Sequence, residues 1–276
     1  MPEGDTIFRA ATNLRKALDG KRVHAVTARP EVRGHDELTG EKVTGVEARG
    51  KHLMMHFENS RVLHSHMGMT GAWHIYPLGH TWYKPKSQAV LAMKTDGHDI
   101  VCFTPKQIRV MTERELQRDL YLQRLGPDLL GPPIPDDVFL RRIRSQQQVA
   151  IGEAIMNQTV VCGIGNIYKS EVLFRERIHP LIIVADLSDE RLLALRDRAR
   201  TLMRLNLDNG PRRTRFRGDE QKLWVYQRSG DHCLQCDSVV EMVRQGDLAR
   251  STYFCSECQR LPKKYEQTNV LGMGER

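Results

Sequence analysis

The sequence predicts a mixed α+β protein of two domains, in which an N-terminal β-sandwich flanked by helices precedes a helical domain with a C-terminal zinc finger. Short runs of alternating apolar residues dominate roughly the first 112 positions. A proline-rich segment follows, and after it the apolar residues recur at helical spacing. Two Cys-x-x-Cys pairs lie near the C-terminal end. At 276 residues the chain has room for two compact units of ordinary size.

The N-terminal domain is predicted over residues 1–118. Residues 3–19 place apolar side chains at helical spacing, and Gly20 ends this helix. Seven short β-like runs follow, separated by Gly, Asn, Asp or Pro at the spacing of a sandwich or barrel. They cover residues 22–28, 42–48, 52–57, 61–67, 72–76, 89–93 and 100–103.

A linker is predicted over residues 119–139, because residues 125–137 contain four prolines. The helical domain then covers residues 140–224, the zinc finger 225–262 and a flexible tail 263–276. Four helices with short connections are expected from the apolar spacing and from Ser and Asp residues at their starts. They cover residues 136–145, 148–158, 166–178 and 188–210.

The charge balance favours a polyanionic partner. Lys and Arg number 42 against 34 Asp and Glu, which gives a net charge of +8. Neutralising phosphates with such side chains releases condensed counterions, so nucleic acid is a candidate ligand. A basic ribosome-associated protein, or simply a soluble one, is the alternative. No apolar run is long enough for a membrane span and no signal peptide follows Met1, so we expect a cytoplasmic protein without a membrane partner.

The strongest local signal is a metal site formed by two cysteine pairs that eighteen residues separate. The spacing C-x2-C-x18-C-x2-C is typical of a structural zinc site with four thiolate ligands, Cys233, Cys236, Cys255 and Cys258. A redox dithiol or an iron site is the alternative. With four protein ligands the site is closed, so one structural Zn²⁺ with no catalytic role is expected. Cys102 and Cys162 are interpreted as packing residues.

Two further features favour anion binding. An apolar helix stops at Gly163-Ile164-Gly165, and Asn166 is predicted to cap a new helix whose free amides can bind an anion. An ordinary helix hairpin is an equally good interpretation of this turn alone. Arg250 lies on a strand that leads to the third cysteine, where its planar fork suits a phosphate; a solvated surface Arg is the alternative.

Four stretches occur together and in order: "PEGDT" after Met1, "GKHL" (50–53), "GIGNIYKSEVLF" (163–174) and "RSTYFCSEC" (250–258). So arranged, they resemble the formamidopyrimidine-DNA glycosylase/endonuclease VIII family, and the resemblance runs from residue 2 to about residue 262. It implies an N-terminal β-sandwich catalytic domain, a helix-two-turn-helix domain and a zinc finger. It also implies base-excision repair of damaged DNA, single- or double-stranded, by a monomer that associates with the nucleoid during repair.

The resemblance implies a chemical role for the first residues. Removal of Met1 leaves Pro2 with a secondary amine, which attacks the sugar C1′ and becomes a Schiff base. Glu3 supplies a proton, although an acid that merely suits a helix N-terminus is the alternative. Lys51 assists β-elimination and Arg250 assists δ-elimination. For Lys51, the alternative to a catalytic role is an ordinary surface lysine at the edge of a strand.

Three further positions are implied to contact DNA. Asn166 matches a phosphate-binding position, Arg124 matches a DNA-contact position, and Met69 matches the apolar residue that fills the gap left by the extruded base. A buried core Met is the alternative for Met69. The stretch 104–111 lacks the Arg-Phe pair of the formamidopyrimidine branch, and only a short basic stretch separates Gly210 from Trp224.

These departures resemble an actinobacterial endonuclease VIII homologue that prefers oxidised pyrimidines. A formamidopyrimidine- or 8-oxoguanine-type glycosylase and a non-catalytic zinc-finger binder of DNA structures are the alternatives. A third, an RNA-directed zinc-ribbon protein, is weakened by an aromatic content of only 6%.

Overall fold

The computed structural model describes residues 2–208, 210–216 and 221–265, and the chain forms two compact units, residues 1–125 and 126–276. The division between them lies inside the segment predicted to be a linker. Each unit has its own elements and its own core, and each is described by itself. No helix among the described residues is both long enough and apolar enough to cross a membrane.

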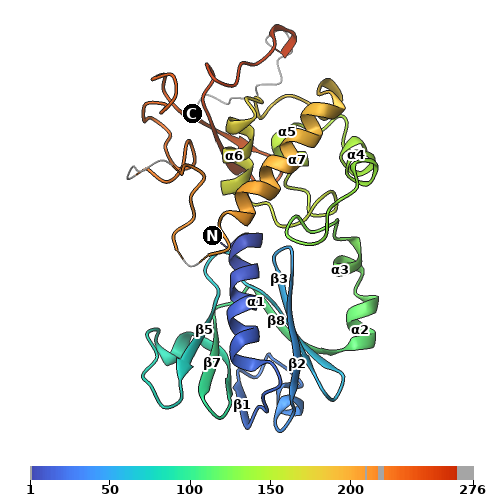
Figure 1. Ribbon diagram of the computed structural model, residues 1–276, viewed down its shortest axis with the longest axis vertical. Coiled ribbons are helices and arrows are strands. Elements are labelled where there is room, and N and C mark those ends of the chain that lie inside the picture. The colour runs from blue at the N-terminus through green and yellow to red at the C-terminus, as the bar shows by residue number, and fades with distance from the viewer. Residues whose placement is uncertain (1, 209, 217–220, 266–276) are drawn as a thin grey trace. The chain divides into compact units, whose positions relative to one another are not determined.

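The first unit is a two-sheet sandwich with one long helix (Figure 1). Its helices are α1 (Gly4–Leu18), α2 (Glu113–Arg118) and α3 (Leu120–Arg124), with 3₁₀ turns η1 (His35–Leu38) and η2 (Lys86–Gln88). Its strands are β1 (Ala25–Ala28), β2 (Val43–Arg49), β3 (His52–Phe57), β4 (Arg61–His66), β5 (Ala72–Pro77), β6 (Ala89–Lys94), β7 (His98–Phe103) and β8 (Gln107–Thr112).

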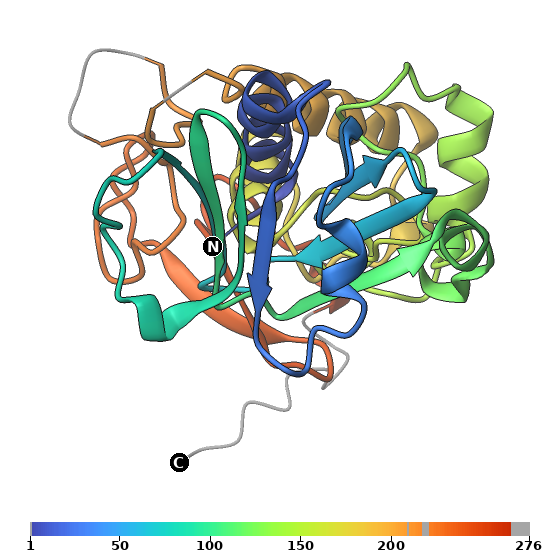
Figure 2. The same ribbon diagram turned by 90° about the horizontal axis from the view of Figure 1, so that it is seen from below.

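Both sheets are antiparallel, with strand orders β1-β6-β7-β5 and β2-β3-β4-β8. In Figures 1 and 2 they lie as separate layers beside α1. Side chains from both sheets and from α1 form one buried core, to which Leu14, Met55 and Ile100 belong. Alternation of apolar residues in the strands and the helical spacing in α1 account for this core. The predicted sandwich is therefore correct.

Strand β8 and the two short helices after it were not predicted. Thr112 caps α2 through a reciprocal pair of bonds with Glu115, and the Asp119 carboxylate accepts the amide hydrogens of Tyr121 and Leu122 in α3. Arg109 of β8 pairs with Asp119 and thereby ties the strand to α3. The two helices have only six and five residues, which is too short for apolar periodicity to reveal them.

The second unit is helical and ends in a two-stranded ribbon. Helices α6 and α7 lie side by side in Figure 1. Its elements are α4 (Asp136–Arg144), α5 (Ile151–Ala154), α6 (Asn166–Arg175), η3 (Val184–Asp186), α7 (Asp189–Arg204), β9 (Glu241–Gln245), β10 (Arg250–Phe254) and η4 (Lys263–Tyr265).

The helix predicted over residues 148–158 is a single turn in the structure. After α5 the Asn157 side chain accepts hydrogen bonds from the amide and hydroxyl of Thr159, which forms a local turn in place of further helix. Gly126 lies against this segment so closely that a Cβ there would come within 2.6 Å of the Val160 carbonyl oxygen. The shortened helix and the glycine together allow the tight chain path before α6.

The ribbon is fastened to the helical part by buried side-chain bonds. Ser170 of α6 accepts the Tyr253 amide hydrogen at 3.1 Å, and Gln259 donates to the Ile178 carbonyl at 2.8 Å. Gln245 donates to the Pro180 carbonyl at 3.1 Å. Tyr265 reaches back to the Ile183 amide at 2.8 Å, so the predicted flexible tail is wrong for residues 263–265; residues 266–276 lie outside the described part of the chain.

Glu171 of α6 organises the segment before the ribbon. Its fully buried carboxylate accepts the amide hydrogens of Trp224, Val225 and Tyr226 at 2.8–2.9 Å, and the hydroxyl of Thr214 as well. A buried carboxylate is stable only when such donors surround it. Glu171 therefore fixes the path of the chain between α7 and the cysteines.

Candidate active site

Pro2 and Glu3 directly precede helix α1. Glu3 is the N-cap residue by backbone geometry, yet its side chain makes no capping hydrogen bond; the acid in the first turn is Asp5. Glu3 is fully buried and Pro2 is half-buried, and Met1 lies outside the described residues.

Lys51 lies at the tip of the β2–β3 hairpin. Arg49 and His52 are paired, which leaves Gly50 and Lys51 as a two-residue turn, and Gly50 has a φ of 59° that suits glycine. The pKa of His66 is lowered by burial and by the charges of Lys106 and Lys51, so the hairpin tip and the end of β4 share one electrostatic neighbourhood. Lys51 is thus held on a rigid turn at one end of the sheet.

A buried histidine pair lies next to this turn, and sequence analysis left its network unrecognised. His52 Nδ1 and His64 Nε2 are 2.9 Å apart, and Arg109 Nε donates to His64 Nδ1 at 3.2 Å. Burial lowers the pKa of His52 to about 3 and that of His64 to about 4, and neighbouring positive charges add to both effects. Both rings are therefore neutral near pH 7, and they link the first residue of β3 to Arg109 and, through it, to Asp119.

Met69 projects from a tight loop. Its side chain is 76% exposed, which excludes the alternative of a buried core Met. A Cβ on Gly71 would come within 2.4 Å of the Met67 carbonyl oxygen, so the loop can close only over glycine. A large apolar side chain on so constrained a loop is suited to insertion between bases.

Two candidate DNA contacts lie at helix ends. Arg124 is exposed as the last residue of α3. Asn166 is the first residue of α6, but the N-cap is Gly165, so the prediction that Asn166 caps the helix is wrong. The extended backbone of Gly165 fills the cap position, and the Asn166 side chain is left for other contacts. Its Oδ1 is buried without a hydrogen-bond partner among the described residues.

Arg250 lines a cavity of about 380 Å³ in the second unit. Glu153, Lys169 and Gln245 line it too, whereas Arg250 itself is exposed at the start of β10. The pKa of Glu153 is raised by burial and by Asp247, while Lys169 opposes this shift. Lys169 is almost fully buried, and sequence analysis did not single it out. The cavity thus combines cationic and acidic groups.

The four cysteines converge as a metal site requires. Their sulfur atoms all lie within 4.8 Å of one another; Cys233 and Cys258 are 3.9 Å apart, and Cys236 and Cys255 are 3.4 Å apart. Tetrahedral zinc with Zn–S bonds of about 2.3 Å places its sulfurs about 3.8 Å apart. These separations are far too long for disulfides. The donor set therefore fits a closed metal site of the zinc type.

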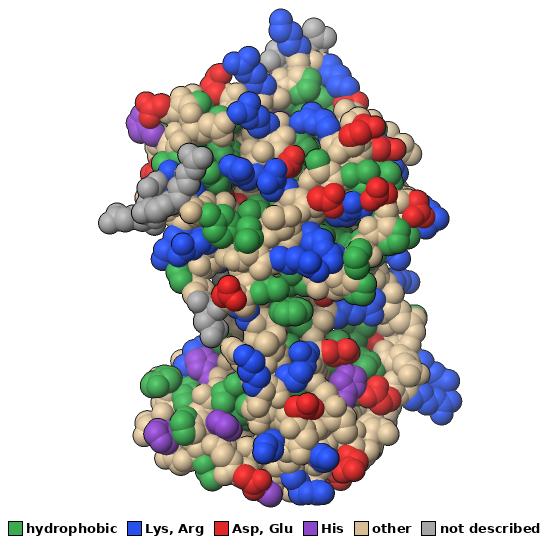
Figure 3. All heavy atoms as spheres, viewed as in Figure 1, with side chains coloured by type: hydrophobic (Ala, Val, Ile, Leu, Met, Phe, Trp, Pro, Cys, Tyr) green, Lys and Arg blue, Asp and Glu red, His purple; other side chains and the backbone are tan. Residues whose placement is uncertain are grey.

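The basic charge of the chain does not by itself locate a binding surface. Figure 3 shows Lys and Arg side chains distributed over the face in view, with acidic side chains among them. The candidate residues divide between the two units: Pro2, Glu3, Lys51, Met69 and Arg124 lie in the first. Asn166, Arg250 and the four cysteines lie in the second.

Comparison with known proteins identifies the family. Residues 1–116 match the formamidopyrimidine-DNA glycosylase N-terminal domain, and residues 125–217 match the H2TH domain of the same glycosylase. A probable endonuclease 8 of Streptomyces coelicolor is 36% identical over 266 residues, which is 95% of each chain. The DNA-(apurinic or apyrimidinic site) lyase Nei2 of Mycolicibacterium smegmatis is 34% identical, with 94% of this chain and 99% of that protein covered.

A third relative, endonuclease 8 of Escherichia coli, is 32% identical, with 94% of this chain and all of that protein covered. Among solved structures, the Lactococcus lactis Fpg in complex with DNA containing an abasic site superposes with a TM-score of 0.81 at 23% identity, over 94% of this chain and all of that one. At this identity the structural likeness concerns the fold. On its sequence matches, the chain belongs to the formamidopyrimidine-DNA glycosylase/endonuclease VIII family.

Proposed function

We propose that this protein is a bifunctional DNA glycosylase and abasic-site lyase that removes oxidised bases, with pyrimidines preferred. Relatives that match nearly its full length are named endonuclease 8 and DNA-(apurinic or apyrimidinic site) lyase. The observation that carries the proposal is Pro2 at the start of α1, followed by the buried carboxyl of Glu3. Once Met1 is removed, an imino group and an acid are adjacent.

Base removal begins at the Pro2 nitrogen. The α-amino group titrates near pH 8, so a neutral fraction is available at physiological pH. Its lone pair forms a bond to C1′ as the bond from C1′ to the base breaks, and the base takes up the proton that the Pro2 nitrogen then loses. The nitrogen then expels the ring oxygen, which Glu3 protonates, and an iminium joins Pro2 to the opened sugar.

Strand cleavage follows from this cation. The iminium acidifies the C2′ hydrogen, and loss of that proton breaks the bond from C3′ to the phosphate oxygen. A second proton loss, from C4′, breaks the bond from C5′ to its phosphate oxygen, and water finally releases Pro2. We assign assistance of the first elimination to Lys51 and of the second to Arg250.

The other candidate residues position the DNA. Asn166 contacts a phosphate, Arg124 contacts the DNA, and Met69 occupies the gap left by the extruded base. Four cysteines hold one structural Zn²⁺, which stabilises the ribbon that carries Arg250. We assign damaged DNA, single- or double-stranded, as the partner of a monomeric cytoplasmic enzyme that associates with the nucleoid.

A preference for pyrimidines is supported by what β8 contains. Residues 107–112 form this strand, and the stretch 104–111 contains no Arg-Phe pair. The segment between Gly210 and Trp224 is short, although residues 217–220 lie outside the described part of the chain. The matched relatives at 30–36% identity carry endonuclease 8 or Nei names, which agrees with this branch.

Borohydride trapping tests the proposal. Protein whose mass proves removal of Met1 is mixed with abasic-site duplex and with thymine glycol, dihydrouracil and 8-oxoguanine duplexes. We expect a covalent adduct that Pro2→Gly largely loses, because a primary-amine imine must be protonated before it is cationic. Lys16→Met, at the exposed far end of the same helix, is the matched control and should keep the adduct.

Failure to trap any adduct with processed wild-type protein would refute the glycosylase proposal. Retained DNA binding in that case would favour the non-catalytic binder. Faster excision of 8-oxoguanine than of thymine glycol would instead overturn the assigned pyrimidine preference and leave the lyase chemistry intact.

A further inference from the structure

A cavity of about 470 Å³ lies in the first unit, apart from every residue to which the repair chemistry is assigned. It opens on the face of the β1-β6-β7-β5 sheet that is turned away from the main core. Strand β7 shows this alternation, since Ile100 packs into the main core and Val101 into a smaller cluster on the opposite face. A cavity of this size accommodates a small organic ligand.

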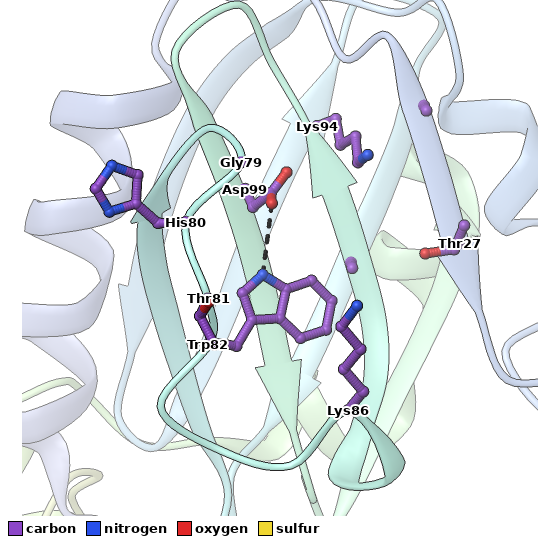
Figure 4. Close-up of a pocket in the computed structure, with 10 residues that line it drawn as sticks. Thr27, Gly79, His80, Thr81, Trp82, Lys86, Lys94 and Asp99 are labelled. Atoms are coloured by element: carbon purple, nitrogen blue, oxygen red, sulfur yellow. Dashed lines mark hydrogen bonds between the residues drawn. The ribbon is translucent and has the colours of Figure 1, made fainter.

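Its lining combines three chemical properties. Figure 4 shows the indole of Trp82 on one side and Thr27 of β1 on the other, with Lys94 and Lys86 toward the two ends. The small side chain of Ala92 leaves the space beside the indole open. An aromatic wall and two ammonium groups therefore face the same space, and the Lys86 ammonium lies over the indole at 5.9 Å from the ring centroid.

Asp99 gives the cavity an unsatisfied acceptor. The residue is only 6% exposed, and one carboxylate oxygen accepts a hydrogen bond from Trp82 Nε1 at 3.4 Å. Its other oxygen, Oδ1, is buried without a hydrogen-bond partner among the described residues. A buried carboxylate oxygen without a donor is costly, so this position is suited to a ligand that brings hydrogen-bond donors.

We propose that this cavity binds a guanine nucleotide. Guanine carries two parallel donors on one edge, N1–H and the 2-amino group, and a carboxylate accepts both. A purine ring stacks on an indole, as bases do on aromatic residues in single-strand binding proteins. The phosphate supplies a partner for the ammonium of Lys86, and Lys94 adds positive charge at the other end of the cavity. A simple cation would be repelled by these lysines, and a neutral sugar would leave them unused.

The inference does not depend on Pro2 chemistry and can be tested separately. The chain has three tryptophans, and each indole N–H gives one peak in a ¹⁵N-labelled protein. Trp82 Nε1 donates to Asp99, whereas Trp73 Nε1 donates to Ser65 and Trp224 Nε1 to the Thr214 carbonyl. Guanosine monophosphate should shift the Trp82 peak and leave the peaks of Trp73 and Trp224 in place.

Ligand and protein variants isolate each contact. Inosine monophosphate lacks the 2-amino donor and should bind about tenfold more weakly. Asp99→Asn keeps an acceptor for Trp82 but removes the charge, and should weaken guanosine monophosphate by at least about tenfold. Lys86→Met should weaken the nucleotide and spare guanosine. Lys84→Met is the control, because Lys84 lies over the Phe103 ring outside the cavity.

Two sources supply the same ligand chemistry, a free nucleotide and the end of a single strand. A thymine oligonucleotide with one 5′-phosphorylated guanine distinguishes them. Tighter binding of the oligonucleotide, by about tenfold or more, identifies nucleic acid as the source, and equal binding identifies the free nucleotide; either result supports the cavity as a nucleotide site.

No shift of the Trp82 peak at about 10 mM guanosine monophosphate would overturn the proposal. A shift that Asp99→Asn leaves unchanged would overturn it as well. Equal weakening of guanosine and its monophosphate by Lys86→Met would overturn the phosphate contact. The borohydride adduct with abasic DNA should persist in all these variants, so failure here is distinct from failure of the glycosylase proposal.

Discussion

Replacing Glu171 with Gln should strongly destabilise the second unit, although the two side chains have the same shape. One carboxylate oxygen accepts the amide hydrogens of Val225 and Tyr226, and the other accepts those of Trp224 and the Thr214 hydroxyl. The variant turns one of these oxygens into an NH₂ group. That group faces the Trp224 N–H, a donor that cannot reverse its role.

The expected magnitude follows from these bonds. A hydrogen bond to a charged group contributes roughly 1.5–3 kcal/mol, and a buried donor without a partner costs a further 1–3 kcal/mol. The variant removes the charge from all four bonds and leaves the Trp224 amide unpaired. Because such losses overlap within one network, we expect destabilisation of about 3–5 kcal/mol.

Urea unfolding of the metal-loaded protein measures this change, and amide hydrogen exchange locates it. Exchange at Trp224, Val225 and Tyr226 should accelerate more than exchange in the core of α7. Glu176→Gln, on the residue that ends the same helix, is the matched control. Glu176 pairs with the partly exposed Arg198 at 2.6 Å, so its loss should cost no more than about 1 kcal/mol. Equal, small effects of both substitutions would refute the reasoning.

Four other outcomes are expected. Hydrogen bonding to Glu47 and then to Glu113 raises the pKa of His56 to about 9 and so favours its protonated form in the folded protein. Raising the pH from 6.5 to 9 should therefore lower the free energy of unfolding by roughly 1–2 kcal/mol in the wild type but not in His56→Gln. Parallel pH profiles of the two proteins would contradict this. Gly71→Ala should cost at least about 2 kcal/mol in urea unfolding, because its Cβ meets backbone, whereas Gly45→Ala, with nothing within 4 Å, should cost under about 0.5 kcal/mol. Met69→Ala should leave stability within about 0.5 kcal/mol but slow base excision from duplex at least about tenfold and spare cleavage of ready-made abasic sites; equal loss of both activities would contradict its role as a wedge. Chelation should release one zinc per chain and lower the melting temperature by roughly 10 °C or more, and a metal-free protein of unchanged stability would exclude a structural site.

Sequence patterns predicted the sandwich, α1, α7 and the cluster of four cysteines because each depends on local periodicity or spacing. Apolar alternation marked the first seven strands, and two Cys-x-x-Cys pairs marked the cysteine cluster without any knowledge of the fold. The same reasoning extended α5 too far, since apolar spacing continues past Ala154. Apolar spacing carries no information on the hydrogen bonds between the Asn157 side chain and Thr159, which form a turn in place of further helix.

Other features depend on residues that are distant in the sequence. Glu171 directly precedes the apolar residues 172–174, but nothing near it in the sequence identifies its partners, which lie 43–55 positions away. The pairing of His52 with His64 and Arg109 requires the strand register. The cavity beside Trp82 likewise arises only when β1, β6 and β7 are aligned. Roles of Pro2, Glu3 and Lys51 stay predictions that chemistry must test.

The hydrogen bonds of Ser170, Gln245 and Gln259 attach the β9–β10 ribbon to the helical part of the second unit. A ribbon connected to the rest of the unit only by its chain ends would rotate relative to the helices, and an arginine at its tip would sample many orientations. Here three hydrogen bonds fix the orientation of β9 and β10, so the loss of any one of them should change the orientation of Arg250 even with all four cysteines intact. Substitution of Ser170, Gln245 or Gln259 should therefore impair the role proposed for Arg250 as well as the packing of the ribbon.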